Sequence, residues 1–299
     1  MNRTPMTDEQ LHEQAIGHEI QFSDNVKKLL EVEKHFINEC TKRKIFWSYD
    51  VTANEPLYFG TLNYTTFAGT FMMHPLQPEM RFIQIQDALR DSVEVKDYVS
   101  LFTDKIKTQT ANKYTERKKL VRRQYDAIVV LPGDNKIKSH ICRRKLKRII
   151  EKHGDDVIFK PHPLTREQTL RELKELIGAK DTHFAPIESD LYDILVNVNH
   201  VYTSHLSESA LYSVSIDKTI SPIDQYDNRQ LSSFAHINYY LFFDDQPKET
   251  INQMFSSYKS GIVCPDIDVN WKEKINSYLD YILQLREKVK DYYVQGEIQ

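Results

Sequence analysis

Residues 127–131 read Ala-Ile-Val-Val-Leu, and residues 132–135, directly after them, read Pro-Gly-Asp-Asn. A short apolar run rich in β-branched residues, without alternating polar side chains, is typical of a strand covered on both faces of a parallel sheet. Proline, glycine, aspartate and asparagine are the residues that form tight turns. The stretch therefore predicts a buried strand that ends at a sharp turn.

The same alternation of strand and helix signals continues along the second half of the chain. Further strands are predicted at 157–160, 184–187, 200–203, 216–223 and 239–243. Amphipathic helices are predicted between them, at 141–150, 166–177 and 190–196. Repeated β-α-β connections favour a doubly wound parallel sheet with right-handed crossovers.

The first half carries α/β signals that are less regular. Helices are predicted at 23–40, 82–89 and 99–106, and strands at 45–49, 57–62 and 67–73. The segment 107–124 is polar and basic without apolar periodicity, as expected for a linker. We therefore expect an α/β domain over 1–115, a second over 125–270, and a final helix over 271–299 that packs across both.

The composition is that of a globular protein. The chain has 299 residues, of which 40% are hydrophobic and 28% are charged. No apolar run reaches the roughly 18 residues that a membrane span needs, and the polar N-terminus lacks the apolar core of a signal peptide. We therefore expect a cytoplasmic protein. The 3 cysteines lie far apart, so they predict neither a disulfide framework nor a metal site.

Positive charge is concentrated in one block. Residues 116–152 contain 13 Lys and Arg against 4 Asp and Glu, in a chain whose net charge is −3. A solvated helix face beside a charged linker is one explanation. The other is a footprint for phosphates, on a nucleotide or along a nucleic acid. The candidate patch lies on the outer face of the helix predicted at 141–150 and comprises Arg143, Arg144, Lys147 and Arg148.

Two motifs follow two of the predicted strands. Residues 160–163 read Lys-Pro-His-Pro, and residues 203–211 read Thr-Ser-His-Leu-Ser-Glu-Ser-Ala-Leu. In open α/β sheets, ligands bind outside the carboxyl ends of the strands, which is where both motifs are expected. The prolines fix the backbone around His162, whose ring can donate to a phosphate. The serines offer hydroxyl donors, and Glu208 can accept from ribose hydroxyls.

Each motif also has a purely structural explanation, because a proline-rich turn and a serine-glutamate helix cap are common. Their joint position on one sheet favours a nucleotide site.

The segment from Ala127 to about Ile223 resembles the donor-binding domain of GT-B glycosyltransferases. The likeness is greatest to the group that contains capsule polysaccharide transferases, CDP-glycerol glycerophosphotransferases and bacterial polysialyltransferases. In that group a strand ending in Lys-Pro-His-Pro is followed by a Ser/Thr-rich turn and a helix that opens with Glu-Ala-Leu. Here the matches are residues 160–163 and Glu208-Ser209-Ala210-Leu211. The spacing from Ser204 to Glu208 is one residue shorter than the family pattern.

The resemblance implies two Rossmann-like domains that face each other across a cleft. It also implies an enzyme that transfers a sugar from a nucleotide sugar, here expected to be a UDP-sugar, to an acceptor hydroxyl. No obligatory cofactor or metal is expected besides this donor. The donor-binding candidates are Gly133, Lys160, His162, Pro163, Ser204, Ser207, Glu208 and Ser209.

The catalytic candidates come from both halves. Asp50 ends a predicted strand of the first domain and is a candidate base for the acceptor hydroxyl, although it can equally be a turn residue. His74 is an alternative base. His162 is expected to stabilise the departing phosphate.

The sequence leaves two classes of acceptor open. The basic block suits the phosphates of duplex DNA, as in bacteriophage enzymes of GT-B fold that glycosylate hydroxymethylated bases, so we expect such a base as acceptor and a host cytoplasm as location. A capsule or teichoic-acid type glycan or polyol phosphate is the alternative. A nucleotide-sugar epimerase and a non-catalytic nucleotide-binding module also remain open.

Overall fold

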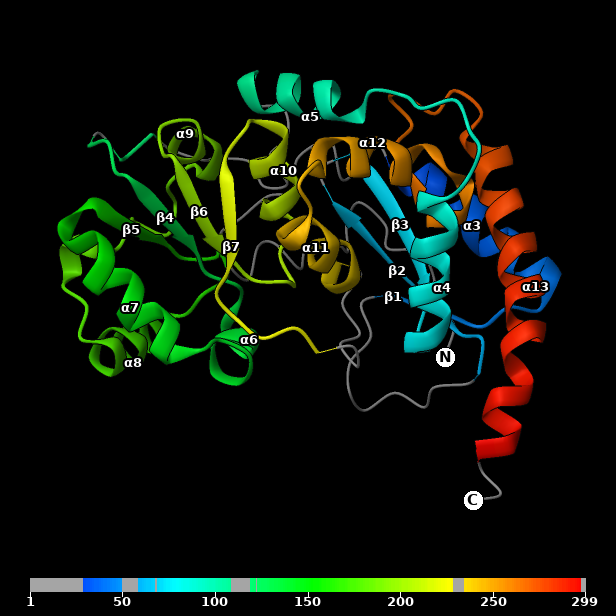
Figure 1. Ribbon diagram of the computed structural model, residues 1–299, viewed down its shortest axis with the longest axis horizontal. Coiled ribbons are helices and arrows are strands. Elements are labelled where there is room, and N and C mark those ends of the chain that lie inside the picture. Colours follow the sequence, from blue (N-terminus) through cyan, green and yellow to red (C-terminus); the bar gives the residue numbers. More distant parts are fainter. Residues whose placement is uncertain are drawn as a thin grey trace.

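The computed structural model describes residues 29–49, 59–67, 69–108, 119–121, 123–227 and 234–296. Within the described residues, the helix predicted at 23–40 corresponds to α3 (Leu30–Arg43). Asp50 and most of the expected linker lie outside them. The described elements form two four-stranded sheets with helices on both faces, so the predicted α/β class is confirmed (Figure 1).

The second sheet has the parallel topology that the sequence predicts. Its strands are β4 (Ala127–Val130), β5 (Val157–Lys160), β6 (His200–Thr203) and β7 (Thr219–Pro222). Their order across the sheet is β5-β4-β6-β7, and every neighbouring pair is parallel. Side chains of β4 alternate between two core clusters, with Ile128 in one and Val129 in the other. This strand is therefore covered on both faces, as its uninterrupted apolar run indicates.

Short helices connect and cover these strands. They are α6 (Asp134–Ser139), α7 (Arg143–His153), α8 (Glu167–Ile177), α9 (Leu191–Leu195) and α10 (Ser209–Ser215). The segment predicted as a strand at 184–187 forms a single bridge, in which Phe184 pairs with Phe159.

The first sheet differs from the parallel order of a Rossmann-like domain. It comprises β1 (Trp47–Tyr49), β2 (Leu62–Phe67), β3 (Thr70–Pro75) and β8 (Ile262–Val263), in the order β1-β2-β3-β8. Only β1 and β2 are parallel, whereas β2-β3 and β3-β8 are antiparallel. Only two residues separate β2 from β3 in the sequence, too few for the helical crossover that a parallel pair needs, and the two strands pair antiparallel.

The chain returns to the first sheet near its end. After α11 (Phe234–Phe243), α12 (Pro247–Ser256) and the 3-10 turn η3 (Tyr258–Ser260), strand β8 pairs with β3. Gly261 has φ +70°, and a Cβ atom there would lie 2.2 Å from the carbonyl oxygen of Met73. Only glycine therefore allows this close approach.

The last helix, α13 (Trp271–Gly296), packs with the first sheet. Its buried side chains, among them Tyr278 and Leu279, share a cluster with α3 and with strands β1, β2, β3 and β8. From the sequence this helix is expected to pack across both halves; its buried side chains belong to the core cluster of the first sheet.

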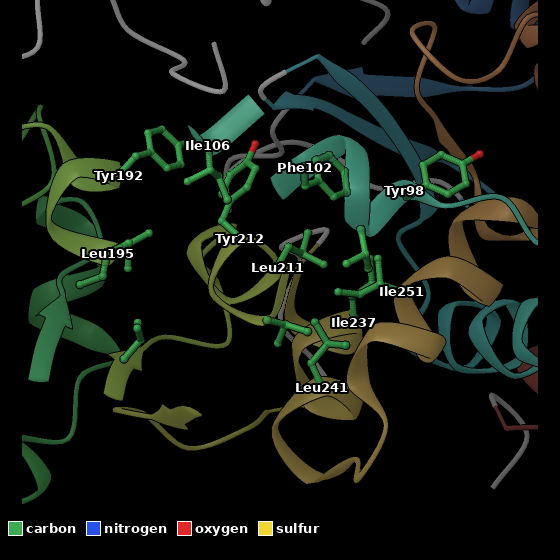
Figure 2. Close-up of a cluster of buried hydrophobic side chains, with 14 of the residues drawn as sticks. Tyr98, Phe102, Ile106, Tyr192, Leu195, Leu211, Tyr212, Ile237, Leu241 and Ile251 are labelled. Carbon is green, nitrogen blue, oxygen red and sulfur yellow. The ribbon is translucent and has the colours of Figure 1, made fainter. Parts of the chain in front are cut away.

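A shared core joins the two sheets. Helices α10, α11 and α12 lie between them, and α5 (Tyr98–Lys107) runs along the top of this layer in Figure 1. Helix α4 (Pro78–Leu89) lies beside β3, toward α13 in this view, and packs against α11 and α12. One apolar cluster runs from Met72 of β3 through Phe102 and Leu211 to Ile128 of β4. Figure 2 shows Leu211 and Tyr212 from α10 beside Phe102 from α5. The two halves are thus packed against each other through apolar side chains.

The prediction of a strand at 239–243 is wrong, because these residues belong to α11. A short apolar run fits a buried strand and a buried helix equally well. The burial pattern is helical, since Ile237 and Leu241 are buried while Tyr239 and Phe243 are exposed.

Candidate functional site

The sequence-predicted donor residues follow three neighbouring strands. Gly133 lies after β4, His162 after β5, and the turn 204–209 after β6. Because the strands are parallel, these segments meet at the same edge of the sheet. From β4 the chain passes to β5, which lies on one side of β4 in the sheet, and later to β6, which lies on the other side of β4. The carboxyl ends of β4 and β6 therefore form a topological switch point, where open α/β sheets bind their ligands.

Lys160 does not point into open solvent at this edge. Its side chain is buried, and its ammonium group donates to the carbonyl oxygens of Pro161 at 2.7 Å and Ile187 at 2.8 Å. These bonds hold the strand end against the segment before α9. The positive charge of Lys160 is therefore buried below the surface of this sheet edge.

His162 has a defined ring orientation. Its Nδ1 atom accepts the backbone N–H of Leu164 at 3.1 Å, and its carbonyl oxygen accepts the N–H of Thr165 at 2.9 Å. In the neutral ring the proton then lies on Nε2, which makes Nε2 a hydrogen-bond donor. Both His162 and Pro163 are partly exposed.

Ser204 is buried and bonded to a carboxylate that the sequence analysis missed. Its hydroxyl donates to Asp224, which follows β7 at the same sheet edge. Asp224 also accepts the backbone N–H of His205 at 3.1 Å and its Nδ1–H at 2.7 Å. Burial alone would raise the pKa of Asp224, but the hydrogen bonds from His205 and Ser204 outweigh it and lower this pKa. Asp224 is thus an ionised, buried anchor of the turn.

The remaining hydroxyls of the turn are mostly bonded to each other. The Ser209 hydroxyl lies 2.6 Å from that of Thr203 and 2.8 Å from that of Ser207. Ser207 and Glu208 are partly exposed, whereas Ser209 is buried. The Glu208 carboxylate adds to burial in raising the pKa values of Tyr192 and Tyr212, so its charge lies close to both rings. Of the polar residues of this motif, Ser207 and Glu208 are the ones with exposed surface.

A second missed residue holds the turn from the other side. Asn238 of α11 is buried, and its amide donates to the carbonyl oxygens of His205 at 2.8 Å and Ser207 at 2.7 Å. Because residues 239–243 were wrongly predicted as a strand, the sequence did not indicate a helix that brings Asn238 to this turn. Asp224 could have been found, because it follows a predicted strand of the same parallel sheet.

The basic face of α7 begins at this edge. The residue before it, Cys142, donates its N–H to Ile223, and Lys145 donates to the carbonyl oxygen of Asp224 at 2.6 Å. The four patch residues are exposed, and none has an ion pair with the residues that the structure describes: Arg143, Arg144, Lys147 and Arg148.

Polar side chains also meet where the two halves join. His74 of β3, Arg81 of α4 and His236 of α11 are all buried and line a cavity of about 20 Å³. Burial, and then the charge of Arg81, lower the pKa of His236 to about 3. His74, the alternative base of the sequence analysis, therefore lies at the junction, while Asp50 lies outside the described residues.

A larger hollow lies at the opposite edge of the second sheet. It measures about 490 Å³ and is lined by Asp126, Asp156, Asn199 and Lys218, which precede the strands. Two carboxylates make it a poor place for phosphates.

Comparison with family models and with curated proteins gives no match for this chain. Among the described residues, no group of three or more His, Cys, Asp or Glu side chains is arranged to hold a metal ion. No described helix is long and apolar enough to span a bilayer.

Proposed function

We propose that this chain is a glycosyltransferase that takes its sugar from a nucleotide sugar, with a UDP-sugar as the first donor to test. The observation that supports this most is the switch point between β4 and β6, where Gly133 and the turn 204–209 follow neighbouring strands. Only the second sheet has the Rossmann-like order, and in this proposal the acceptor approaches from its junction with the first half.

The donor's diphosphate would lie along this edge. His162 supports the assignment because its Nε2–H can donate to a phosphate oxygen, and the buried Lys160 ammonium adds positive potential. The hydroxyl of Ser207 can donate to the same group. Glu208 can accept from the ribose hydroxyls.

Nucleotide binding tests this proposal directly. We expect calorimetric titration with UDP to give a defined dissociation constant, and His162→Ala to weaken it about tenfold, which corresponds to the removal of one hydrogen bond. His200→Ala is the matched control, because His200 begins β6 at the opposite edge. If UDP, CDP, GDP and ADP all fail to bind at millimolar concentration, the donor site is refuted.

The products formed from a nucleotide sugar distinguish a glycosyltransferase from the other candidate classes. Labelled nucleotide sugars incubated with duplex DNA containing hydroxymethylated bases should yield labelled DNA. The exposed cations of α7, which form no ion pair with the described residues, favour this polyanionic acceptor over a neutral glycan. Release of free sugar or an epimerised donor without any acceptor would point to the other classes.

A further inference from the structure

His205 has the environment of a proton-transferring histidine. Its Nδ1 atom lies 2.7 Å from the carboxylate of Asp224, which also accepts its backbone N–H, so the ring is fixed. With the Nδ1 proton directed to Asp224, the lone pair of the neutral ring lies on Nε2. A carboxylate on one ring nitrogen orients the imidazole and stabilises the imidazolium that forms when the other takes up a proton.

The Nε2 atom of His205 is not used by the fold. It is buried and has no hydrogen-bond partner among the described residues, in a side chain that is 3% exposed. Its surroundings are aromatic, because the ring centroids of Phe242 and Tyr226 lie 4.8 Å and 5.7 Å away. A buried imidazole nitrogen without a partner carries a cost in stability, so a functional use is a reasonable explanation.

The rings around His205 lead to the junction of the two halves. Tyr226 contacts His205 on one side and His236, 5.6 Å away between ring centroids, on the other. His236 shares its cavity with Arg81 and His74 of the first half. The aromatic rings around Nε2 therefore lie between the donor turn and the side from which an acceptor would approach.

Tyr226 packs against His205 through its ring. It is partly exposed, and among the described residues it has ring contacts with His205, His236 and Tyr239 and no hydrogen bond from its hydroxyl. For the hydroxyl of a bound acceptor to reach Nε2, the acceptor would replace these contacts.

We propose that His205 is the general base of the transfer reaction and that Asp224 is its positioning residue. This proposal rests on the proposed glycosyltransferase function. Nε2 takes the proton of the acceptor hydroxyl while the oxygen forms its bond to the anomeric carbon of the donor. The bond from that carbon to the phosphate oxygen breaks, and its electron pair leaves with the nucleoside diphosphate. His205 then releases the proton to solvent.

Kinetics of two variants test the role. We expect His205→Gln to lower kcat at least about 100-fold, the usual contribution of a general base, while the donor KM changes less than about threefold. The acidic limb of the pH profile of kcat/KM should disappear. Asp224→Asn should lower kcat with little change in the donor KM, because Nδ1 of the ring then lacks the carboxylate that orients it. His200→Gln, at the opposite end of β6, should retain the wild-type profile.

A second measurement does not depend on turnover. Long-range ¹H–¹⁵N NMR of histidine-labelled protein should show the Nδ1–H tautomer of His205, and a change at Nε2 when acceptor and UDP are both added.

The outcomes separate the two proposals. Wild-type protein that binds no nucleotide refutes the donor site and the base together. Wild-type transfer with an unchanged rate and pH profile in a folded His205→Gln variant refutes only the base. If His205→Gln does not fold, an unshifted Nε2 signal in the wild-type ternary mixture overturns the assignment.

Discussion

The ammonium group of Lys160 lies 2.8 Å from the carbonyl oxygen of Ile187. The sequence motif suggests a lysine that contacts phosphate, yet the buried side chain is held by two carbonyl groups instead. A cation in this position supports the sheet edge structurally and acts on a ligand only through its field. Stability and binding should therefore respond differently when it is replaced.

Lys160→Met should lower the free energy of unfolding by about 2 kcal/mol, because two buried carbonyl groups are deprived of a charged donor. Urea denaturation measures this change, and Lys180→Met, which removes an exposed ion pair with Asp155, is the control with an effect below about 0.5 kcal/mol. The Kd of UDP should rise only moderately. Unchanged stability together with complete loss of UDP binding would contradict the structural role.

Stability should decrease in mildly acidic solution because of His236. Burial and the charge of Arg81 hold its folded-state pKa at about 3, below its ordinary value. As the pH falls below about 6.5, the unfolded chain binds a proton that the folded protein does not, which favours unfolding. Between about pH 7.5 and about pH 5 this histidine alone should remove about 2 kcal/mol. Urea titrations at both pH values should show a smaller loss of unfolding free energy in His236→Gln than in the wild-type protein. The same loss in both proteins would refute the assignment.

The basic face of α7 should govern salt-dependent binding to DNA. Replacing Lys147 and Arg148 by glutamate should weaken binding and reduce the slope of log K against log salt by about 2, because two phosphates are then no longer neutralised by the protein. Lys272→Glu with Lys288→Glu changes the charge equally on α13, whose exposed face belongs to the other half. Fluorescence anisotropy at several salt concentrations measures both. Equal effects of the two pairs would mean that net charge alone matters.

The middle helices should make the protein unfold as one unit. Leu211 is fully buried in the cluster that joins both sheets (Figure 2). Leu211→Ala should cost about 2–5 kcal/mol. It should lower the temperature of a single thermal transition, seen alike by the fluorescence of Trp47 and Trp271, which both pack in the cluster of the first sheet, and by hydrogen exchange of β4. Two separated transitions would show that the halves are energetically independent.

Local signals account for the second sheet. Strands β5 and β6 match the predicted residues, and β4 differs by one, because short β-branched runs bounded by turn residues leave little alternative. The first sheet was less predictable, since its fourth strand has two residues and pairs with β3 from far along the chain. Asp224 and Asn238 act on a turn that lies 19 and 33 residues away, and no spacing pattern reports such contacts.

The return of β8 to β3 affects the order in which the molecule can be built. During synthesis the first three strands leave the ribosome early, but the fourth follows only after residue 261. Domains generally fold as their residues emerge. Here the second sheet can form while the first still exposes the edge of β3, so the part of the protein made first is the part completed last.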